Sequence, residues 1–522
     1  MTIDKKSVSL ATINDSLYKV AKGAGIVFVG TVIGMIFGFV NRILIARYFT
    51  KADYGIFSLS FVIVNVCITV SLLGLQQGLT RQIAYHHNKN DSRINKIVST
   101  AVQIILISSI SLSIILIFSS DFLSVKIFHD FSLKMPLKIF AVSIPFFALI
   151  MIFVSIFRGF GNVKEKVFFQ DLARNVFFLS FLFFVIALNL PFVYVIYAFT
   201  ASVAITFVIF IFYIYKKGLL SKIKLKDFDM QEGKKLLFFS LPLLGVFMLN
   251  MIMNWTDTLM LGYYKSSDIV GLYNAASPLA RLLSIFLTSL GFIYMPIISL
   301  LYSQNLIGEI KKVYQIITKW VFSFTLPFSM IFLLFPKAIL TFFFGSKYVE
   351  AVPVLQFLSI CFLFHSFLGP QGETLLAMGK SKYLSYAAVT GAVLNVALNA
   401  SLIPMMGLAG AAIATMISWD LAQIINLLGL YHYSKIQPFT VQYLKPVMGA
   451  VIATSIIYLI TKWISIKFWA LPLLFVLYIF IYGLSLLFTK SVEKEDIEMV
   501  LMIENRLGIE NHFISKIVRR FV

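Results

Sequence analysis

The chain has few of the residues from which soluble domains and secreted scaffolds are built. Only 13% of its 522 residues are charged, whereas about 25% is usual in soluble domains. It has two cysteines, Cys67 and Cys361, too few for a disulfide framework or a cysteine-based metal cluster. Both lie in apolar runs, where an unpaired cysteine behaves as a small buried hydrophobe. These shortages exclude a disulfide scaffold and argue against a string of soluble domains.

The common signatures of enzymes and ATPases are also missing. His86 and His87 are adjacent and the other four histidines are isolated, so no helix carries a zinc-protease pair. The stretch 372–381 has six residues between Gly372 and Gly379-Lys380-Ser381, where a phosphate-binding loop requires four. The longest connection between apolar runs has about twenty residues and is basic, unlike the carboxylate-rich loop of a membrane glycosyltransferase. We therefore expect no catalytic residue, no metal and no cofactor.

What the sequence does contain is apolar. Hydrophobic residues make up 59% of the chain, 53 residues are Phe, and the mean hydropathy is +0.91. Because a membrane-spanning helix needs about 20 apolar residues, the sequence predicts an all-α polytopic membrane protein with about 14 transmembrane helices. The predicted spans are 24–46, 54–78, 97–119, 137–157, 168–189, 192–215, 236–261, 271–300, 313–335, 353–377, 384–403, 409–431, 445–463 and 469–489.

The positive charges predict the orientation of the chain in the membrane. A net charge of +21 could indicate nucleic-acid binding, but the charges lie in short segments between apolar runs, which excludes that partner. With the N-terminus inside, 30 Lys and Arg residues fall on the inner connections and termini, against 10 on the outer connections. The positive-inside rule then predicts a multi-pass protein of the cell membrane with both termini cytoplasmic. The first apolar run is too long for a cleaved signal peptide.

Three landmarks repeat at nearly one offset and predict an internal duplication. Gly55 and Gly271 are 216 residues apart, Gly161 and Gly379 are 218 apart, and Pro191 and Pro404 are 213 apart. Six spans return the chain to its starting side, so the two copies share one orientation and are related by an axis along the membrane normal. The predicted organisation is a cytoplasmic N-terminus (1–23), an N-lobe (24–215), a basic linker (216–235), a C-lobe (236–431), two extra spans (445–489) and a cytoplasmic tail (490–522).

The linker and the tail carry basic residues that favour contact with membrane lipids. The linker reads KKGLLSKIKLKDFDMQEGKK, and in the tail Ile514, Ile517 and Phe521 recur at helical spacing with basic residues between them. This pattern is typical of a helix that lies on an anionic cytoplasmic leaflet, and equally of a solvated tail.

A few polar and ionisable residues lie inside the predicted spans, where burying a charge costs roughly 2.5–3.5 kcal/mol. In one span Asn250, Asn254 and Asp257 share a helical face, and in the next Arg281 stands on a stripe of hydroxyl side chains. The bland interpretation is hydrogen bonding between packed helices. The functional interpretation is a polar cavity. It is favoured by Arg42, Arg281 and Asp257, because none of them has an opposite charge within one helical turn. Further candidates are Arg174 next to Asp171, Asn395 with Asn399, and Asp420.

Several N-terminal motifs resemble those of a known family. They are Ala21-Lys22-Gly23, Ile45-Ala46-Arg47-Tyr48, Asp53-Tyr54-Gly55-Ile56-Phe57, Leu73-Gly74-Leu75 and Thr80-Arg81. Together with the span plan, they resemble the polysaccharide transporter family, the Wzx-type oligosaccharide flippases of the multidrug/oligosaccharidyl-lipid/polysaccharide exporter superfamily. The resemblance implies two six-helix lobes around a central cavity that opens alternately to either side.

The resemblance also implies a substrate and a set of site residues. The substrate is an oligosaccharide on a polyprenyl phosphate or pyrophosphate, moved from the cytoplasmic to the outer leaflet, and glycan-assembly proteins are possible partners. The residues expected to bind substrate are Arg42, Arg281, Asn250, Asn254 and Arg174; those expected to couple transport to an ion are Asp257 and Asp420; the matching motif positions are Arg47, Asp53, Gly55 and Arg81. A flippase for the peptidoglycan precursor and a multidrug exporter of the same fold stay open as alternatives, and a membrane-embedded glycosyltransferase is a remote one.

Overall fold

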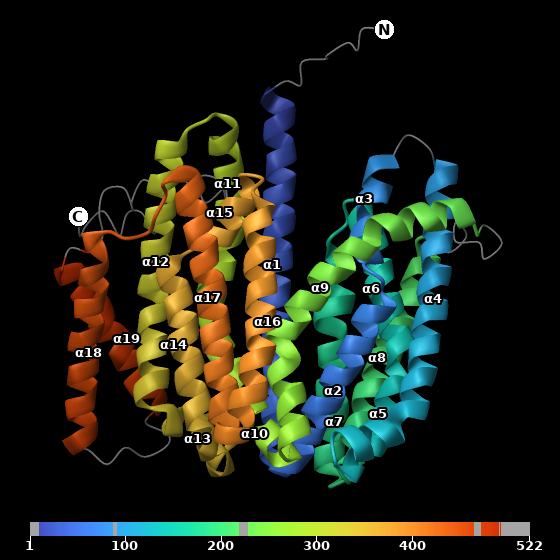
Figure 1. Cartoon of the computed structure of the whole chain (residues 1–522), viewed down its shortest axis with the longest axis horizontal. Helices are drawn as coiled ribbons and strands as arrows, with labels where there is room; N and C mark the ends of the chain where they lie inside the picture. The colour runs from blue at the N-terminus through green and yellow to red at the C-terminus, as the bar shows by residue number, and fades with distance from the viewer. Residues whose placement is uncertain (1–9, 87–90, 219–227, 464–470, 490, 492–522) are drawn as a thin grey trace.

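The structure is a bundle of long helices (Figure 1). The computed structural model describes residues 10–86, 91–218, 228–463, 471–489 and 491. The expected lipid-binding tail and the middle of the basic linker lie outside the described residues.

The expected membrane fold is confirmed. Twelve described helices are long and apolar enough to cross a membrane, and a bent pair of helices passes the same test when its two parts are taken as one span. That pair meets at an angle of 43° near Val142. The last expected span, 469–489, has a shorter apolar stretch than the others, Leu473–Leu486. The expected count of 14 spans is reached when the bent pair and the last, shorter helix are each counted as one span.

The first lobe, which we call the N-lobe, contains helices α1 to α8. Their bounds are α1 Leu10–Tyr48, α2 Lys51–Ser71, α3 Leu75–His86, α4 Asp91–Phe122, α5 Lys134–Ala141, α6 Ser143–Gly159, α7 Arg174–Ala187 and α8 Val193–Lys216. A π-helix, Lys166–Ala173, leads directly into α7.

The second lobe, the C-lobe, contains α9 to α17, and two more helices follow it. Their bounds are α9 Met230–Tyr264, α10 Ser267–Arg281, α11 Ile285–Ser303, α12 Ile307–Leu334, α13 Pro336–Phe344, α14 Val352–Leu368, α15 Gln371–Ala377, α16 Ser381–Met406, α17 Leu408–Ser434, α18 Leu444–Trp463 and α19 Leu471–Phe488. Helices α18 and α19 pack against α12 at the edge of the C-lobe that is remote from the N-lobe (Figure 1).

Helix α9 connects the two lobes and slants across the space between them (Figure 1). Its first turn is capped by Asp229, which accepts hydrogen bonds from the main chain of Gln231 and Glu232 and whose carboxyl pKa these bonds lower. Its first half packs on the N-lobe, where Glu232 pairs with Arg93 at 3.1 Å. Its second half packs on α16 and α17. The expected lobe boundary at residue 236 thus falls within one continuous helix.

The hairpins α1–α2 and α9–α10 repeat each other with an offset of 216 residues. Helix α1 ends at Tyr48 and α9 at Tyr264, while α2 begins at Lys51 and α10 at Ser267. A Cβ atom on Gly55 would lie 1.8 Å from the carbonyl oxygen of Ser267, and one on Gly271 would lie 2.2 Å from that of Lys51. These reciprocal contacts place an internal two-fold axis at the crossing of α2 and α10, where only glycine lets the backbones approach this closely.

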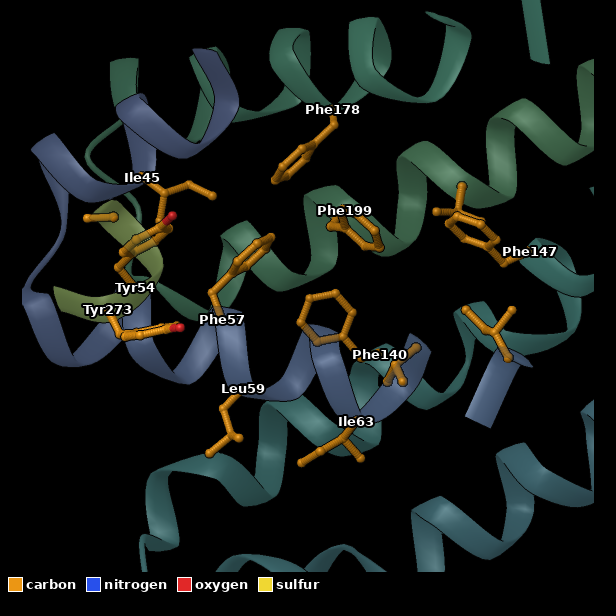
Figure 2. Packing of buried hydrophobic residues seen from close by; sticks show 14 of the residues in the cluster. Ile45, Tyr54, Phe57, Leu59, Ile63, Phe140, Phe147, Phe178, Phe199 and Tyr273 are labelled. Atoms are coloured by element: carbon orange, nitrogen blue, oxygen red, sulfur yellow. The ribbon is translucent and has the colours of Figure 1, made fainter. Parts of the chain in front are cut away.

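An aromatic cluster holds the N-lobe helices together around Phe57 (Figure 2). The Phe57 ring lies 5.6 Å from Phe140, 6.0 Å from Phe178 and 6.1 Å from Phe199, measured between ring centroids. Such pairs contribute about 0.5–1.5 kcal/mol each beyond their buried area. Because these rings come from α2, α5, α7 and α8, they fix the helices that line the polar pocket described next.

Candidate functional site

A pocket of about 80 Å³ lies between the lobes and contains two arginines, Arg42 and Arg174. Arg42 lies beside the hydroxyl of Tyr54. The pocket is lined by Gly38, Asn41, Arg42, Ile45, Tyr54, Phe57, Ser58, Phe61, Arg174, Asn175, Phe178, Phe199, Trp255 and Asn274.

Arg174 is positioned by aromatic rings rather than by a carboxylate. Its guanidinium carbon lies 5.0 Å from the centre of the Phe147 ring and 5.9 Å from that of Phe199. One nitrogen donates to the side chain of Asn175 at 3.2 Å, and its buried Nε has no hydrogen-bond partner. The guanidinium therefore keeps donor capacity for a ligand in the pocket.

The π-helix before α7 gives Asp171 a partner other than Arg174, its neighbour in the sequence. Lys166 lies 2.8 Å from the Asp171 carboxylate, and the hydroxyl of Thr31 donates to the same oxygen at 2.8 Å. In a π-helix the main-chain hydrogen bonds join residues five apart, so Lys166 and Asp171 stand on one face. Reading this stretch as an α-helix misses the pairing of Lys166 with Asp171. It therefore also misses that the Arg174 guanidinium is available to a ligand.

On the C-lobe side, Arg281 is held by Asn254. One guanidinium nitrogen donates to the Asn254 side-chain oxygen and another donates to its main-chain oxygen at 3.2 Å. The structure thus joins these two expected substrate-binding residues. Asn250, the third expected residue of this group, is exposed and donates to the carbonyl of Val246 in its own helix.

Asp257 is buried in the C-lobe, with 1% of its surface exposed. It accepts hydrogen bonds from Asn399 at 2.8 Å, from Thr415 at 2.6 Å and from the hydroxyl of Tyr273. The carboxylate therefore joins α9, α10, α16 and α17. Asn399 also donates to Asn395 at 3.1 Å, and its own side-chain oxygen is buried without a partner. The sequence indicated the Asn residues, whereas Thr415 and Tyr273 carry no signal that separates them from other residues of their type.

Asp420, the second expected ion-coupling residue, lies apart from this cluster of hydrogen bonds. It is half-buried on α17 beside Cys361, and one of its carboxylate oxygens is buried without a hydrogen-bond partner. One turn further along α17, Gln423 accepts a hydrogen bond from Gln371 at 2.7 Å.

Two of the motif residues, Asp53 and Arg47, hold helix ends. Asp53 forms a capping box with Thr50 at the start of α2, and Arg47 donates to the main chain of α13, including a bond of 2.8 Å to the carbonyl of Phe343. Asp53 and Arg47 thus make two separate interactions and do not pair with each other. Arg81 lies 4.5 Å from the ring centre of Phe239.

An apolar groove of about 350 Å³ lies beside the C-terminal end of α10. Two of its lining residues, Leu279 and Leu282, flank Arg281 in the sequence. The remaining wall comes from α12, α13, α18 and α19. It is lined by Leu279, Leu282, Phe328, Ile331, Phe332, Phe335, Ile339, Phe342, Phe343, Ile457, Thr461, Leu474, Phe475 and Tyr478.

Comparison with known proteins gives two family matches. Residues 20–301 match the family described as "Polysaccharide biosynthesis protein", and residues 242–401 match the MatE family. The first match begins just before the N-terminal motifs and includes all of them.

Relatives and solved structures agree with these matches. The chain is 24% identical to a putative O-antigen transporter of Shigella flexneri, over 74% of this chain and 90% of the relative. It is 29% identical to the probable flippase AglR of Haloferax volcanii, over 37% of this chain and 40% of the relative. Its fold is similar to that of the lipid II flippase MurJ in an inward closed conformation, with a TM-score of 0.70 at 17% identity, covering 89% of this chain and 98% of the other. The resemblance found in the N-terminal motifs is thereby confirmed, and the chain belongs to the polysaccharide biosynthesis protein family.

Proposed function

We propose that this protein moves a lipid-linked oligosaccharide, carried on a polyprenyl phosphate or pyrophosphate, from the cytoplasmic to the outer leaflet. The observation that carries the proposal is the pair of cations, Arg42 and Arg174, that line the pocket between the lobes, with Arg281 held by Asn254 on the C-lobe side. In the part of the chain that the structure describes, none of the three forms an ion pair with a carboxylate. Relatives named as an O-antigen transporter and a flippase support the same substrate class.

A phosphorylated head group suits this arrangement. Guanidinium groups present planar pairs of donors that match phosphate oxygens, and the bonds are strengthened by charge. Bringing several cations together in a membrane is unfavourable unless an anion joins them. We infer that the phosphate lies between Arg42 and Arg281, with Arg174 reaching it or the adjacent sugar from the pocket.

The apolar groove gives the lipid tail a place close to the head group. Leu279 and Leu282, which line the groove, are close to Arg281 along the chain, and we infer that one substrate spans from a phosphate at that arginine to a tail in the groove. The groove volume falls within the roughly 300–1,000 Å³ of typical ligand pockets. A polyprenyl tail is much longer than the groove, so its remainder stays in the bilayer.

We further infer that Asp257 couples transport to the binding of a proton or a sodium ion. Its carboxylate and the oxygens of Thr415 and Asn399 are hard ligands from three helices. Neutralising the carboxylate weakens its bonds to three other helices at once, so the bound ion biases the packing of the C-lobe. Asp420, with its unpartnered oxygen, is a second candidate for this role.

The proposal includes an orientation. Both termini lie in the cytoplasm of a multi-pass protein of the cell membrane, and the α1–α2 turn faces outward. The basic linker and tail then contact the cytoplasmic leaflet, and glycan-assembly proteins are candidate partners. The protein changes the location of its substrate and not its covalent structure, so we infer that it is not an enzyme.

Reconstitution into vesicles tests the proposal. A fluorescent polyprenyl-diphosphate disaccharide should become accessible to a membrane-impermeant quencher faster in vesicles with the protein than in vesicles without it. Failure to accelerate this exchange, with the protein folded and an ion gradient imposed, would rule the function out.

A multidrug exporter is the alternative to which the MatE match points. Such a protein needs a carboxylate that faces the cavity, but Asp257 is almost fully buried and engaged by three donors. In the same vesicles, uptake of ethidium driven by an ion gradient would favour the exporter.

A further inference from the structure

The two lobes are tied together at the end of the bundle that carries the α1–α2 turn. Arg47, in the last turn of α1, donates to the carbonyls of Phe342 and Phe343 at the end of α13. Lys347, in the following 3₁₀-helix Ser346–Ala351, donates to the carbonyls of Phe49 and, at 3.4 Å, of Arg47. The last carbonyls of a helix have no partner within the helix. Each helix end thus receives its missing donor from the other lobe.

Two further contacts strengthen this reciprocal capping. Lys51 pairs with Glu350 at 3.1 Å, and the ring of Phe39 lies 5.4 Å from Phe343 and 6.0 Å from Phe344. We call these contacts, together with those of Arg47 and Lys347, the closing contacts. They join residues nearly 300 positions apart, and opening this end of the bundle requires breaking them.

Helix α13 belongs to the closing contacts and to the apolar groove at once. The carbonyls of Phe342 and Phe343 accept the bonds from Arg47, and the same two residues line the groove. The helix is short and is bounded by Pro336 at its start and by Gly345, with a φ of 97°, at its end. A proline and a left-handed glycine let a short helix shift as a unit relative to its neighbours.

We propose that α13 couples loading of the groove to opening of the closing contacts. An apolar chain lying against Phe342 and Phe343 displaces α13, and the bonds from Arg47 to their carbonyls weaken. The inference rests on the proposed function, because a lipid-linked substrate supplies the chain. It adds that the substrate's tail, and not only its head group, promotes opening toward the outer face.

Thermodynamic linkage gives this proposal a distinctive consequence. If a chain in the groove weakens the closing contacts, then removing those contacts must strengthen binding of the chain by the same factor. Arg47→Ala should therefore bind an uncharged prenyl alcohol more tightly, about 5-fold at the lower end of typical coupling. A merely structural role for Arg47 predicts unchanged or weaker binding.

The experiment uses the purified full chain in lipid nanodiscs, with geranylgeraniol as the probe. Spin labels at Tyr48→Cys and Lys337→Cys, with the native cysteines replaced by alanine, report the separation of α1 and α13. Geranylgeraniol should lengthen this distance, Arg47→Ala should lengthen it without ligand, and Arg47→Lys should lie between Arg47→Ala and the wild type. A distance that does not change at saturating geranylgeraniol, or wild-type affinity in Arg47→Ala, would overturn the proposal.

Two matched variants complete the design. Lys138→Ala removes a cation that pairs with Asp121 away from the closing contacts, and it should leave the distance and the affinity unchanged. Phe475→Ala removes a ring from the groove wall on α19, opposite α13, so it should weaken binding but keep the full distance change at saturation. Loss of that change in Phe475→Ala counts against α13 as the coupling element. A protein that translocates the glycolipid without a distance change refutes only this inference, whereas absent translocation refutes the proposed function.

Discussion

At the scale of single residues, Arg281 is the sharpest test of the substrate's charge. Arg281→Ala should reduce glycolipid translocation in vesicles by about 10-fold or more, since hydrogen bonds to charged groups contribute about 1.5–3 kcal/mol each. Protein abundance should stay near normal because no carboxylate is left unpaired. Arg281→Lys should recover only part of the activity, because the ammonium lacks the planar pair of donors.

The matched control for Arg281 is Lys337→Ala, which removes an exposed cation of α13 outside the arginine site. It should translocate like the wild type. Equal translocation by Arg281→Ala and Lys337→Ala would remove Arg281 from the site.

The buried carboxylate predicts a different phenotype. Asp257→Asn keeps the shape of the side chain but loses the charge, so translocation should no longer respond to an imposed proton or sodium gradient, while glycolipid binding persists. The comparison is Asp121→Asn, which alters an exposed carboxylate paired with Lys134 and should keep the gradient response. Loss of glycolipid binding in Asp257→Asn, with Arg281→Ala mild, would point to a cation exporter instead.

At the scale of helices, the crossing of α2 and α10 leaves no room for a methyl group. Gly55→Ala places a Cβ atom on the Ser267 carbonyl, and overpacking of this kind typically costs about 1–3 kcal/mol. The variant should unfold at a lower temperature in detergent. Gly308→Ala, at a helical position with nothing within 4 Å, should be neutral or slightly stabilising. Equal melting temperatures for the two variants would show that the helices separate at this crossing without cost.

The sequence predicted the long membrane-spanning helices but missed two shorter helical segments. Apolar length predicted the spans, because burial in lipid is a property of each segment by itself. The π-helix at Lys166–Ala173 and the short α13 were missed, since both depend on neighbours that are distant in the sequence. The capping of α13 by Arg47 joins residues 296 positions apart, and a single sequence contains no signal for such a contact.

The candidate site was predictable to a similar degree. Arg42, Arg281 and Asp257 stood out because charges are rare in spans. In the structure Arg42 lines the pocket, Arg281 is held by Asn254 and Asp257 is buried in the C-lobe, and their roles stay predictions. Asn250 shares a helical face with Asn254, but it is exposed and bonded within its own helix, so its place in the substrate site stays a prediction. The groove could not be foreseen, because apolar side chains in a membrane protein look alike whether they face lipid or a cavity.

At the scale of the whole molecule, the distribution of positive charge predicts the topology. A reporter that is active only in the cytoplasm should work when fused within the linker 216–235 or after Lys490, and it should fail when fused near Lys265, in the α9–α10 turn. The expectation follows from the excess of Lys and Arg on one set of connections. Activity at Lys265 would overturn the orientation and with it the direction of transport.

The internal two-fold axis also has an energetic consequence. Asn41 and Asp257 occupy equivalent places, each seven residues before the end of its helix, so an amide in one lobe stands where a carboxylate stands in the other. This pair therefore carries one elementary charge per molecule. A single charge moved through a membrane potential of 100 mV supplies about 2.3 kcal/mol. If one ion at Asp257 drives transport as proposed, this electrical part alone is worth about fifty-fold in the substrate distribution, and a concentration gradient of the ion adds to it.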